Sequence, residues 1–89
     1  MNSAHPPAPA HPDAQAALVS HRHIEVFRAV MTAGSVTSAA ALLHSSQPTV
    51  SRELARLEQL LGYPLFERLQ GRLRPNARAL ALWDEVQRS

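Results

Sequence analysis

The chain has 89 residues, room for one small domain, and contains no cysteine, so disulfide bridges and cysteine-based zinc sites are excluded. The sequence has no apolar run of about 18 residues and no basic region followed by an apolar one at its N-terminus. We therefore expect a cytoplasmic protein without a membrane span or a secretory signal.

The basic residues stand out by type rather than by number. The formal net charge is only +2, but all nine basic residues are arginine and none is lysine. Arginine carries a planar fork of donors that suits phosphate groups and guanine edges. Genome composition explains the bias equally well, so the charge alone identifies no partner.

Residues 1–20 differ in composition from the rest of the chain. They contain four of the seven prolines and many alanines, and apart from Met1 their large apolar residues are only Leu18 and Val19. Such a segment buries too little surface to offset its ordering entropy, so we expect a disordered leader. Residues 13–20 could instead extend the first helix. The leader has no Arg or Lys, which argues against a DNA-binding arm.

Residues 21–33 have the apolar spacing of a helix, and Gly34 supplies a left-handed stop. Ser35 can cap a second, short helix. The small alanines of this second helix would let another helix approach closely. The predicted buried stripes are Ile24, Phe27, Val30 and Met31 in the first helix and Val36, Ala39, Ala40 and Leu43 in the second.

A third helix is predicted from Ser46 to Leu61. Ser46 is a good cap residue, and Pro48 fits the first turn because its missing N–H would have no partner there. Gly62 ends the helix and Pro64 prevents it from resuming. Val50, Leu54, Leu57 and Leu61 form the predicted buried stripe, and the opposite face carries Pro48, Arg52, Ala55, Arg56 and Gln59.

The remaining residues predict a hairpin and a last helix. Leu65, Phe66 and Arg68 suggest a short strand, residues 69–71 a turn, and residues 72–74 a return strand. Asn76 can cap a helix that runs from Ala77 to about Arg88, with one apolar stripe made of Ala79, Leu82, Trp83 and Val86. The predicted order is therefore helix, helix, helix, two-stranded wing, helix.

Two short helices joined by a tight turn, the second with a polar outer face, form a helix-turn-helix whose second helix enters the DNA major groove N-terminus first. Arg52 can donate two hydrogen bonds to guanine, and Gln47 can pair with adenine. Pro48 can contact a thymine methyl group, and Ser46 and Ser51 can donate to phosphate oxygens. The hairpin arginines suit the phosphate backbone or an adjacent minor groove.

The segments AAALLHSSQPTVSRELARLEQLLGYPLFER and GRLRPNARAL resemble the N-terminal domain of LysR-type transcriptional regulators. SQPTVSR, LE, LG and LFER occur in order and at the family's spacing, and the resemblance covers about residues 21–89. It implies a mainly α fold, with a winged helix-turn-helix of three helices and a two-stranded wing at residues 21–75 and a linker helix at residues 76–89. It also implies sequence-specific binding of double-stranded DNA at an interrupted inverted repeat, as a homodimer through the linker helix or as a tetramer in the full-length parent.

The resemblance assigns roles to individual residues. Departures from the family occur where it commonly has Leu-Thr and this chain has Pro75-Asn76, and where it often has Gly and this chain has Ala79, which should stiffen the linker helix. The implied base-reading positions are Gln47, Pro48, Ser51 and Arg52; the backbone contacts are Ser46, Thr49, Arg56, Arg68, Arg72 and Arg74; and the predicted dimer seam is Ala79, Leu82, Trp83 and Val86. Packing on the first helix within one chain is the alternative for that seam.

LysR-type regulators also carry a C-terminal effector-binding domain of the periplasmic-binding-protein type. The sequence stops at Ser89, so we expect that domain to be absent and no small-molecule effector to bind. Two other functions fit a winged helix: a protein–protein interaction module, and a DNA-binding domain of the molybdate-regulator type. Arg52 and Arg56 argue against the first, and the SQPTVSR and LFER segments favour the LysR type over the second.

Catalysis and metal binding find little support. His21 and His23, at i and i+2, do not share a helix face and have no carboxylate at suitable spacing. Ser45 and Ser46 beside His44 lack an elbow motif and a paired acid. The sequence therefore predicts no enzyme, no metal site and no cofactor.

Overall fold

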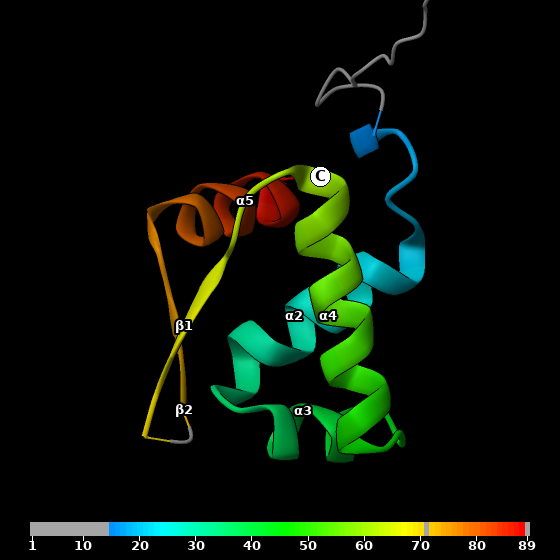
Figure 1. Cartoon of the computed structure of the whole chain (residues 1–89), viewed down its shortest axis with the longest axis vertical. Coiled ribbons are helices and arrows are strands. Elements are labelled where there is room, and N and C mark those ends of the chain that lie inside the picture. Colours follow the sequence, from blue (N-terminus) through cyan, green and yellow to red (C-terminus); the bar gives the residue numbers. More distant parts are fainter. Residues whose placement is uncertain (1–14, 71, 89) are drawn as a thin grey trace, which may run out of the picture.

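The computed structural model describes residues 15–70 and 72–88, so residues 1–14 of the leader predicted at residues 1–20 lie outside the described residues. The order of elements is the predicted one, and the fold is a mainly helical winged helix-turn-helix (Figure 1). The elements are α2 (His21–Ala33), α3 (Val36–Leu42), α4 (Gln47–Leu61), β1 (Phe66–Leu69), β2 (Arg72–Pro75) and α5 (Ala77–Arg88).

The start of α2 is set by a cap at Ser20. The Ser20 backbone is extended, and its hydroxyl accepts a hydrogen bond from the His23 N–H. Before it, the Leu18 N–H donates to the Gln15 carbonyl at 2.9 Å, which makes a separate turn. Residues 15–20 therefore do not extend α2: residues 15 and 16 are helical, residues 17 and 18 form a turn, and Val19 packs against the core.

Serine caps begin α3 and α4, and left-handed glycines end α2 and α4, as the sequence predicts. Ser35 and Ser46 cap α3 and α4, and Gly34 and Gly62 follow α2 and α4 with φ of 81° and 87°. A Cβ at either glycine would meet no atom within 4 Å, so the glycines are needed for their backbone conformation alone. His44, in the turn between α3 and α4, also has a positive φ, 53°.

Two groups of apolar side chains form the interior, and α2 contributes to both. This explains why Val26 and Ala29 are buried although the predicted stripe of α2 omitted them. The inner core cluster joins α2, α3, α4 and β2 through Val26, Ala29, Val30, Ala39, Ala40, Val50, Leu54 and Leu73. The α5 core cluster joins α2, α4 and α5 through Phe27, Leu57, Leu65, Ala79 and Val86.

The predicted stripe of α4 is confirmed except at its last member. Leu60 is only 4% exposed, whereas Leu61 is partly buried and packs against the α5 core cluster. These two residues point about 100° apart on the helix. At this end of α4, neighbouring elements therefore cover two adjacent sides of the helix, and not only the side that carries the predicted stripe.

The wing is an antiparallel pair in which Arg68 faces Leu73 and Glu67 faces Arg74. β1 begins and ends one residue later than predicted, and β2 is one residue longer, since Leu69 pairs with Arg72 and Phe66 with Pro75. Successive side chains alternate between the two faces of a hairpin. Leu73 turns inward and is 8% exposed, which anchors the wing to the inner core cluster.

The elements gather into two ends along the long axis of the molecule (Figure 1). At one end lie the wing tip, α3 and the start of α4; at the other lie α5 and the end of α4. No helix among residues 15–70 and 72–88 is long and apolar enough to cross a membrane. The same residues contain no group of three His, Cys, Asp or Glu arranged to hold a metal ion.

Candidate nucleic-acid interface

The exposed edge of α4 begins with a hydrogen-bonded cap. The Ser46 Oγ accepts from the Thr49 N–H at 3.3 Å and donates to the Thr49 Oγ1 at 2.9 Å. Pro48 lies in the first turn, where no backbone donor is lost. Gln47 and Pro48 are exposed beside the cap, so the first turn presents an amide and an apolar ring to solvent.

Arg52 and Arg56 continue this edge one and two turns further along α4. Both are exposed, and among the described residues neither forms an ion pair. The Arg52 Nη2 lies 3.5 Å from the Thr49 Oγ1, and the Arg56 Nη1 lies 3.4 Å from the Gln59 Oε1. Their guanidinium groups therefore carry uncompensated charge and keep most of their donors free for a ligand.

The residues predicted to read bases do not all project equally. Gln47, Pro48 and Arg52 are exposed, whereas Ser51 is half-buried. Ser51 lies about 100° from Arg52 around the helix, nearer to the buried stripe. The structure thus places three of the four on the outer surface and the fourth on a flank of α4.

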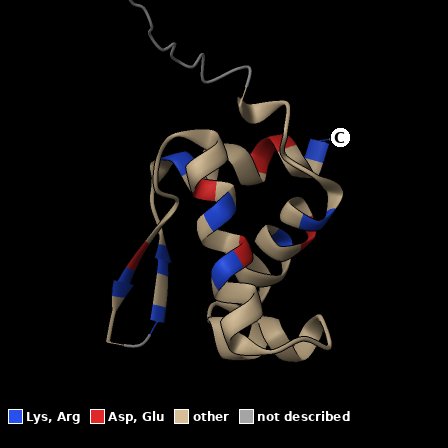
Figure 2. Ribbon diagram, turned by 45° about the vertical axis from the view of Figure 1, so that its right-hand side comes forward, with Lys and Arg blue, Asp and Glu red and all other residues tan. Residues whose placement is uncertain are grey.

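Basic residues lie on both wing strands as well as on α4 (Figure 2). The register puts Arg72 and Arg74 on one face of the hairpin, and Arg68 on the face that carries Leu73. Glu67 lies directly opposite Arg74 and reduces the local positive charge. All three arginines are exposed, so the wing presents cations on both faces rather than one basic strip.

Glu58, which the sequence analysis did not single out, holds the wing to α4. Its Oε2 accepts hydrogen bonds from the Leu65 N–H at 2.7 Å and the Phe66 N–H at 3.3 Å. A carboxylate near the C-terminal end of a helix is disfavoured by the helix dipole. The position of Glu58, four residues before Gly62, therefore indicates from the sequence alone that its carboxylate binds a group outside the helix.

Asn76 fastens the other side of the wing. Its Oδ1 accepts from the Ala79 N–H at 2.9 Å, which confirms the predicted cap of α5. Its side-chain amide also donates to the Pro64 carbonyl at 2.8 Å, and its backbone N–H donates to the Leu65 carbonyl at 2.9 Å. One residue thus starts α5 and joins the two ends of the wing.

An ion pair that the sequence analysis did not identify joins α2 to α4. The Arg22 Nε lies 3.0 Å from the Glu53 Oε1, and the Arg22 Nη1 lies 3.2 Å from the Glu25 Oε1. Hydrogen bonds to Glu25 and Glu53 raise the pKa of the Arg22 guanidinium above its ordinary value. Glu53 neighbours Arg52 in sequence. Arg22 therefore neutralises the carboxylate that lies nearest in sequence to the exposed arginine.

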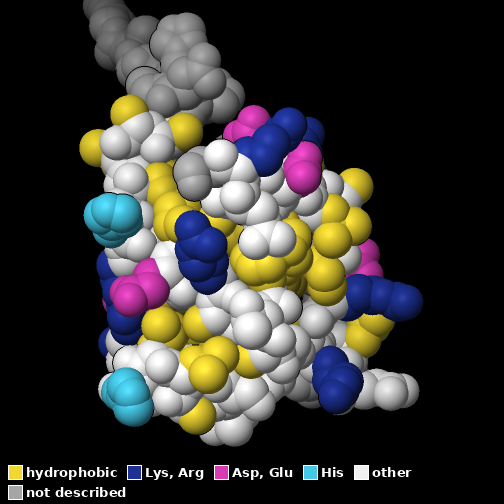
Figure 3. All heavy atoms as spheres, turned by 180° about the vertical axis from the view of Figure 1, so that it is seen from behind, with side chains coloured by type: hydrophobic (Ala, Val, Ile, Leu, Met, Phe, Trp, Pro, Cys, Tyr) yellow, Lys and Arg dark blue, Asp and Glu magenta, His cyan; other side chains and the backbone are white. Residues whose placement is uncertain are grey.

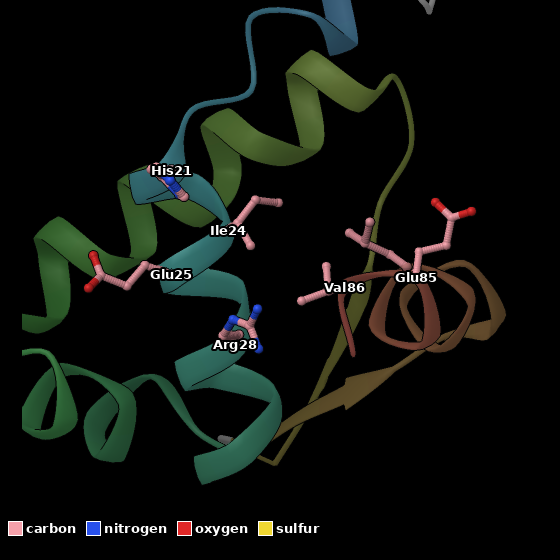
Figure 4. A pocket seen from close by; sticks show the side chains of 7 residues that line it. His21, Ile24, Glu25, Arg28, Glu85 and Val86 are labelled. Atoms are coloured by element: carbon pink, nitrogen blue, oxygen red, sulfur yellow. The ribbon is translucent and has the colours of Figure 1, made fainter. Parts of the chain in front are cut away.

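The stripe of α5 packs on α2 within the chain. Ala79 and Val86 are buried, and Leu82 and Trp83 are partly buried against the same cluster. The Trp83 ring lies 6.2 Å from the Phe27 ring in an edge-to-face arrangement. A pocket of about 550 Å³ opens between the two helices, with Ile24 of α2 facing Val86 of α5 (Figure 4).

These features define the class of the protein as a winged helix-turn-helix with a further helix after the wing. Residues 21–80 match the model of the bacterial regulatory helix-turn-helix proteins of the lysR family. The chain therefore belongs to the lysR family.

Similar proteins and structures agree with this assignment. The transcriptional activator protein LysR of Escherichia coli is 66% identical over 73 residues, which are 82% of this chain and 24% of that protein. The regulator DgcR of a Pseudoalteromonas species is 55% identical over 65 residues, 73% of this chain and 22% of that protein. A CbnR DNA-binding domain in complex with DNA superposes with a TM-score of 0.75 at 34% identity, covering 79% of this chain and 80% of that one.

The chain spans about a quarter of the length of the curated relatives that it matches. The matched part is the family's DNA-binding domain, and the relatives are named as transcriptional regulators rather than as enzymes. This agrees with the non-enzymatic function that the sequence predicts.

Proposed function

We propose that this domain binds double-stranded DNA sequence-specifically as a homodimer in the bacterial cytoplasm, at an interrupted inverted repeat, for a transcriptional regulator. The observation that carries the proposal is the exposed edge of α4, where Gln47, Pro48 and Arg52 project from the N-terminal half of a helix whose other side is buried. An α-helix with its side chains is about as wide as the DNA major groove.

Gln47, Pro48, Ser51 and Arg52 are the proposed base-reading residues. Arg52 is long enough to reach a guanine edge from the outer line of α4, and Ser51 on the flank is better placed for the edge of the groove. The proposed backbone contacts are Ser46, Thr49, Arg56, Arg68, Arg72 and Arg74. The wing tip and the start of α4 lie at the same end of the molecule, so both can approach one duplex (Figure 1).

Dimerisation is proposed through α5. Of the predicted seam, Ala79 and Val86 are buried in their own chain, which leaves Leu82 and Trp83 with apolar surface for a partner. Leu80, on the Trp83 side of the helix, is 54% exposed. Hydrophobic side chains are also in view on the face opposite to that of Figure 1 (Figure 3). Analytical ultracentrifugation of Leu80→Glu and Glu67→Gln tests this: the first should weaken self-association, and the second, an exposed control on the wing, should not.

Selection of binding sites from random duplexes, followed by anisotropy titrations, tests DNA recognition. Arg52→Ala should lose about 1–3 kcal/mol of binding free energy at the selected site and relax base preference, because a bidentate base contact is lost. Arg74→Ala should weaken binding to all sequences alike and reduce the salt dependence. An Arg52→Ala variant that binds every site as the parent does would disprove the base-reading assignment.

A winged-helix module for protein contact is the alternative function. Such a module should bind random duplex negligibly at low salt, whereas the proposed domain should bind it with an affinity that falls steeply as salt rises. The uncompensated guanidinium groups of Arg52 and Arg56 favour DNA over a protein partner.

A further inference from the structure

The hydrogen bonds of His23, in the first turn of α2, fix the orientation of its ring and the roles of the two ring nitrogens. The Ser20 N–H donates to the His23 Nδ1 at 2.9 Å, and the His23 N–H donates back to the Ser20 Oγ at 3.3 Å. Together these bonds form a capping box in which histidine takes the place usually held by Glu or Gln.

A backbone N–H can only donate, so the Nδ1 that faces it must accept. The neutral ring then carries its proton on Nε2, which becomes a hydrogen-bond donor aimed away from the cap. The capping box therefore orients the ring and selects the tautomer that presents Nε2–H.

His23 lies beside the arginine edge of α4. Together with Arg52, Arg56, Gln59, Ala55 and Glu53 it lines an open depression of about 410 Å³. Two of these residues carry guanidinium groups, and the one carboxylate, Glu53, is paired with Arg22 at 3.0 Å. The depression, which lies between α2 and the outer side of α4, therefore carries a net positive charge.

The position of this depression suits a phosphate strand. When a helix fills the major groove, which is about 12 Å wide, the two sugar-phosphate strands run along its flanks. The first turn of α2 adjoins the flank of α4 that carries Arg52 and Arg56. A strand along that flank would bring its phosphate oxygens into the depression.

We propose that His23 binds the DNA backbone through its Nε2–H, which donates to a phosphodiester oxygen seated between His23 and Arg56. The inference rests on the proposed DNA binding and extends the interface from α4 and the wing to α2. The contact is independent of base sequence, because every nucleotide presents the same phosphate oxygens.

Two substitutions of equal charge separate this contact from general electrostatics. His23→Glu keeps the capping acceptor but replaces the outward Nε2–H donor with a negative charge, whereas His21→Glu makes the same charge change in the same turn of α2. His21 is exposed and borders the pocket between α2 and α5 instead (Figure 4). His23→Gln keeps both the capping acceptor and an outward N–H donor.

The measurement is an anisotropy titration of the whole 89-residue chain with a fluorescent duplex of random sequence at low salt, with circular dichroism melting of each variant. His23→Glu should weaken binding about tenfold more than His21→Glu, because a hydrogen bond to a charged group is lost and a repulsion is added. His23→Gln should bind within about threefold of the parent.

Equal losses for His23→Glu and His21→Glu would overturn the contact. Should His23→Glu melt below the assay temperature, His23→Asn replaces it, since the shorter amide retains an acceptor near Ser20 and withdraws the donor from the depression. Binding by His23→Asn equal to that by His23→Gln would then overturn it. A parent chain that fails to bind the duplex would refute the proposed function itself, and this contact with it.

Discussion

The helices α4 and α5 have similar apolar stripes but use them differently. In α4 the residues Val50, Leu54 and Leu57 are 0–3% exposed, so the packing of the chain covers all of the stripe except its last member, Leu61. In α5 only the ends of the stripe, Ala79 and Val86, are buried, and the large residues between them are partly uncovered. We infer that α4 acts through its polar face and α5 through the apolar surface that the chain leaves open.

The largest expected effect sharpens this contrast in burial. Leu57→Ala should lower the free energy of unfolding by about 2–5 kcal/mol, because Leu57 is fully buried where α2, α4 and α5 meet. Leu82→Ala in α5 should cost markedly less, since Leu82 is only partly buried. Urea unfolding of both variants, at a concentration where the parent is monomeric, measures the difference. Equal costs would contradict the distinction between the two stripes.

The next effect concerns the junction that leads from α4 through the wing to α5. Glu58→Ala should cost about 1–3 kcal/mol, because the partly buried N–H groups of Leu65 and Phe66 lose their acceptor. Glu67→Ala, an exposed change in β1, is the matched control. Urea unfolding gives the two stabilities, and amide hydrogen exchange at Leu65 should accelerate only in the first variant. Unchanged hydrogen exchange at Leu65 would contradict the conclusion that Glu58 holds the wing to α4.

The smallest effect compares the caps of the two helices. Asn76→Ala should destabilise by about 1–2 kcal/mol, because the residue both caps α5 and donates to the Pro64 carbonyl. Ser46→Ala should cost about 0.5–1 kcal/mol, because its exposed hydroxyl serves only the first turn of α4. Thermal unfolding followed by circular dichroism ranks the two. A larger cost for Ser46→Ala would contradict the expectation that the Asn76 cap, with its added bond to the Pro64 carbonyl, contributes more stability than the Ser46 cap.

Local sequence chemistry anticipated most of the helix ends. Ser35, Ser46 and Asn76 are caps, and Gly34 and Gly62 are left-handed stops, as their side chains or lack of one dictate. These outcomes depend on a few neighbouring atoms, so the sequence suffices to predict them. The exposed positions of Gln47, Pro48 and Arg52 follow equally from the period of an amphipathic helix.

Contacts between distant residues were not predictable in the same way. The Arg22–Glu53 pair, the bonds of Glu58 to the wing and the packing of Trp83 near Phe27 join positions that no local pattern relates. The same holds for Leu60, which neighbouring elements cover outside the predicted stripe.

The sequence by itself determined which segments are helical, where most of them begin and end, and that Gln47, Pro48 and Arg52 face outward on α4. The tertiary structure alone decided that α2 serves both core clusters, that α5 buries only part of its stripe, and that His23 adjoins Arg56. The physical reason is range: caps and periodicity act within a turn or two of helix, whereas burial and pairing depend on which elements meet in space.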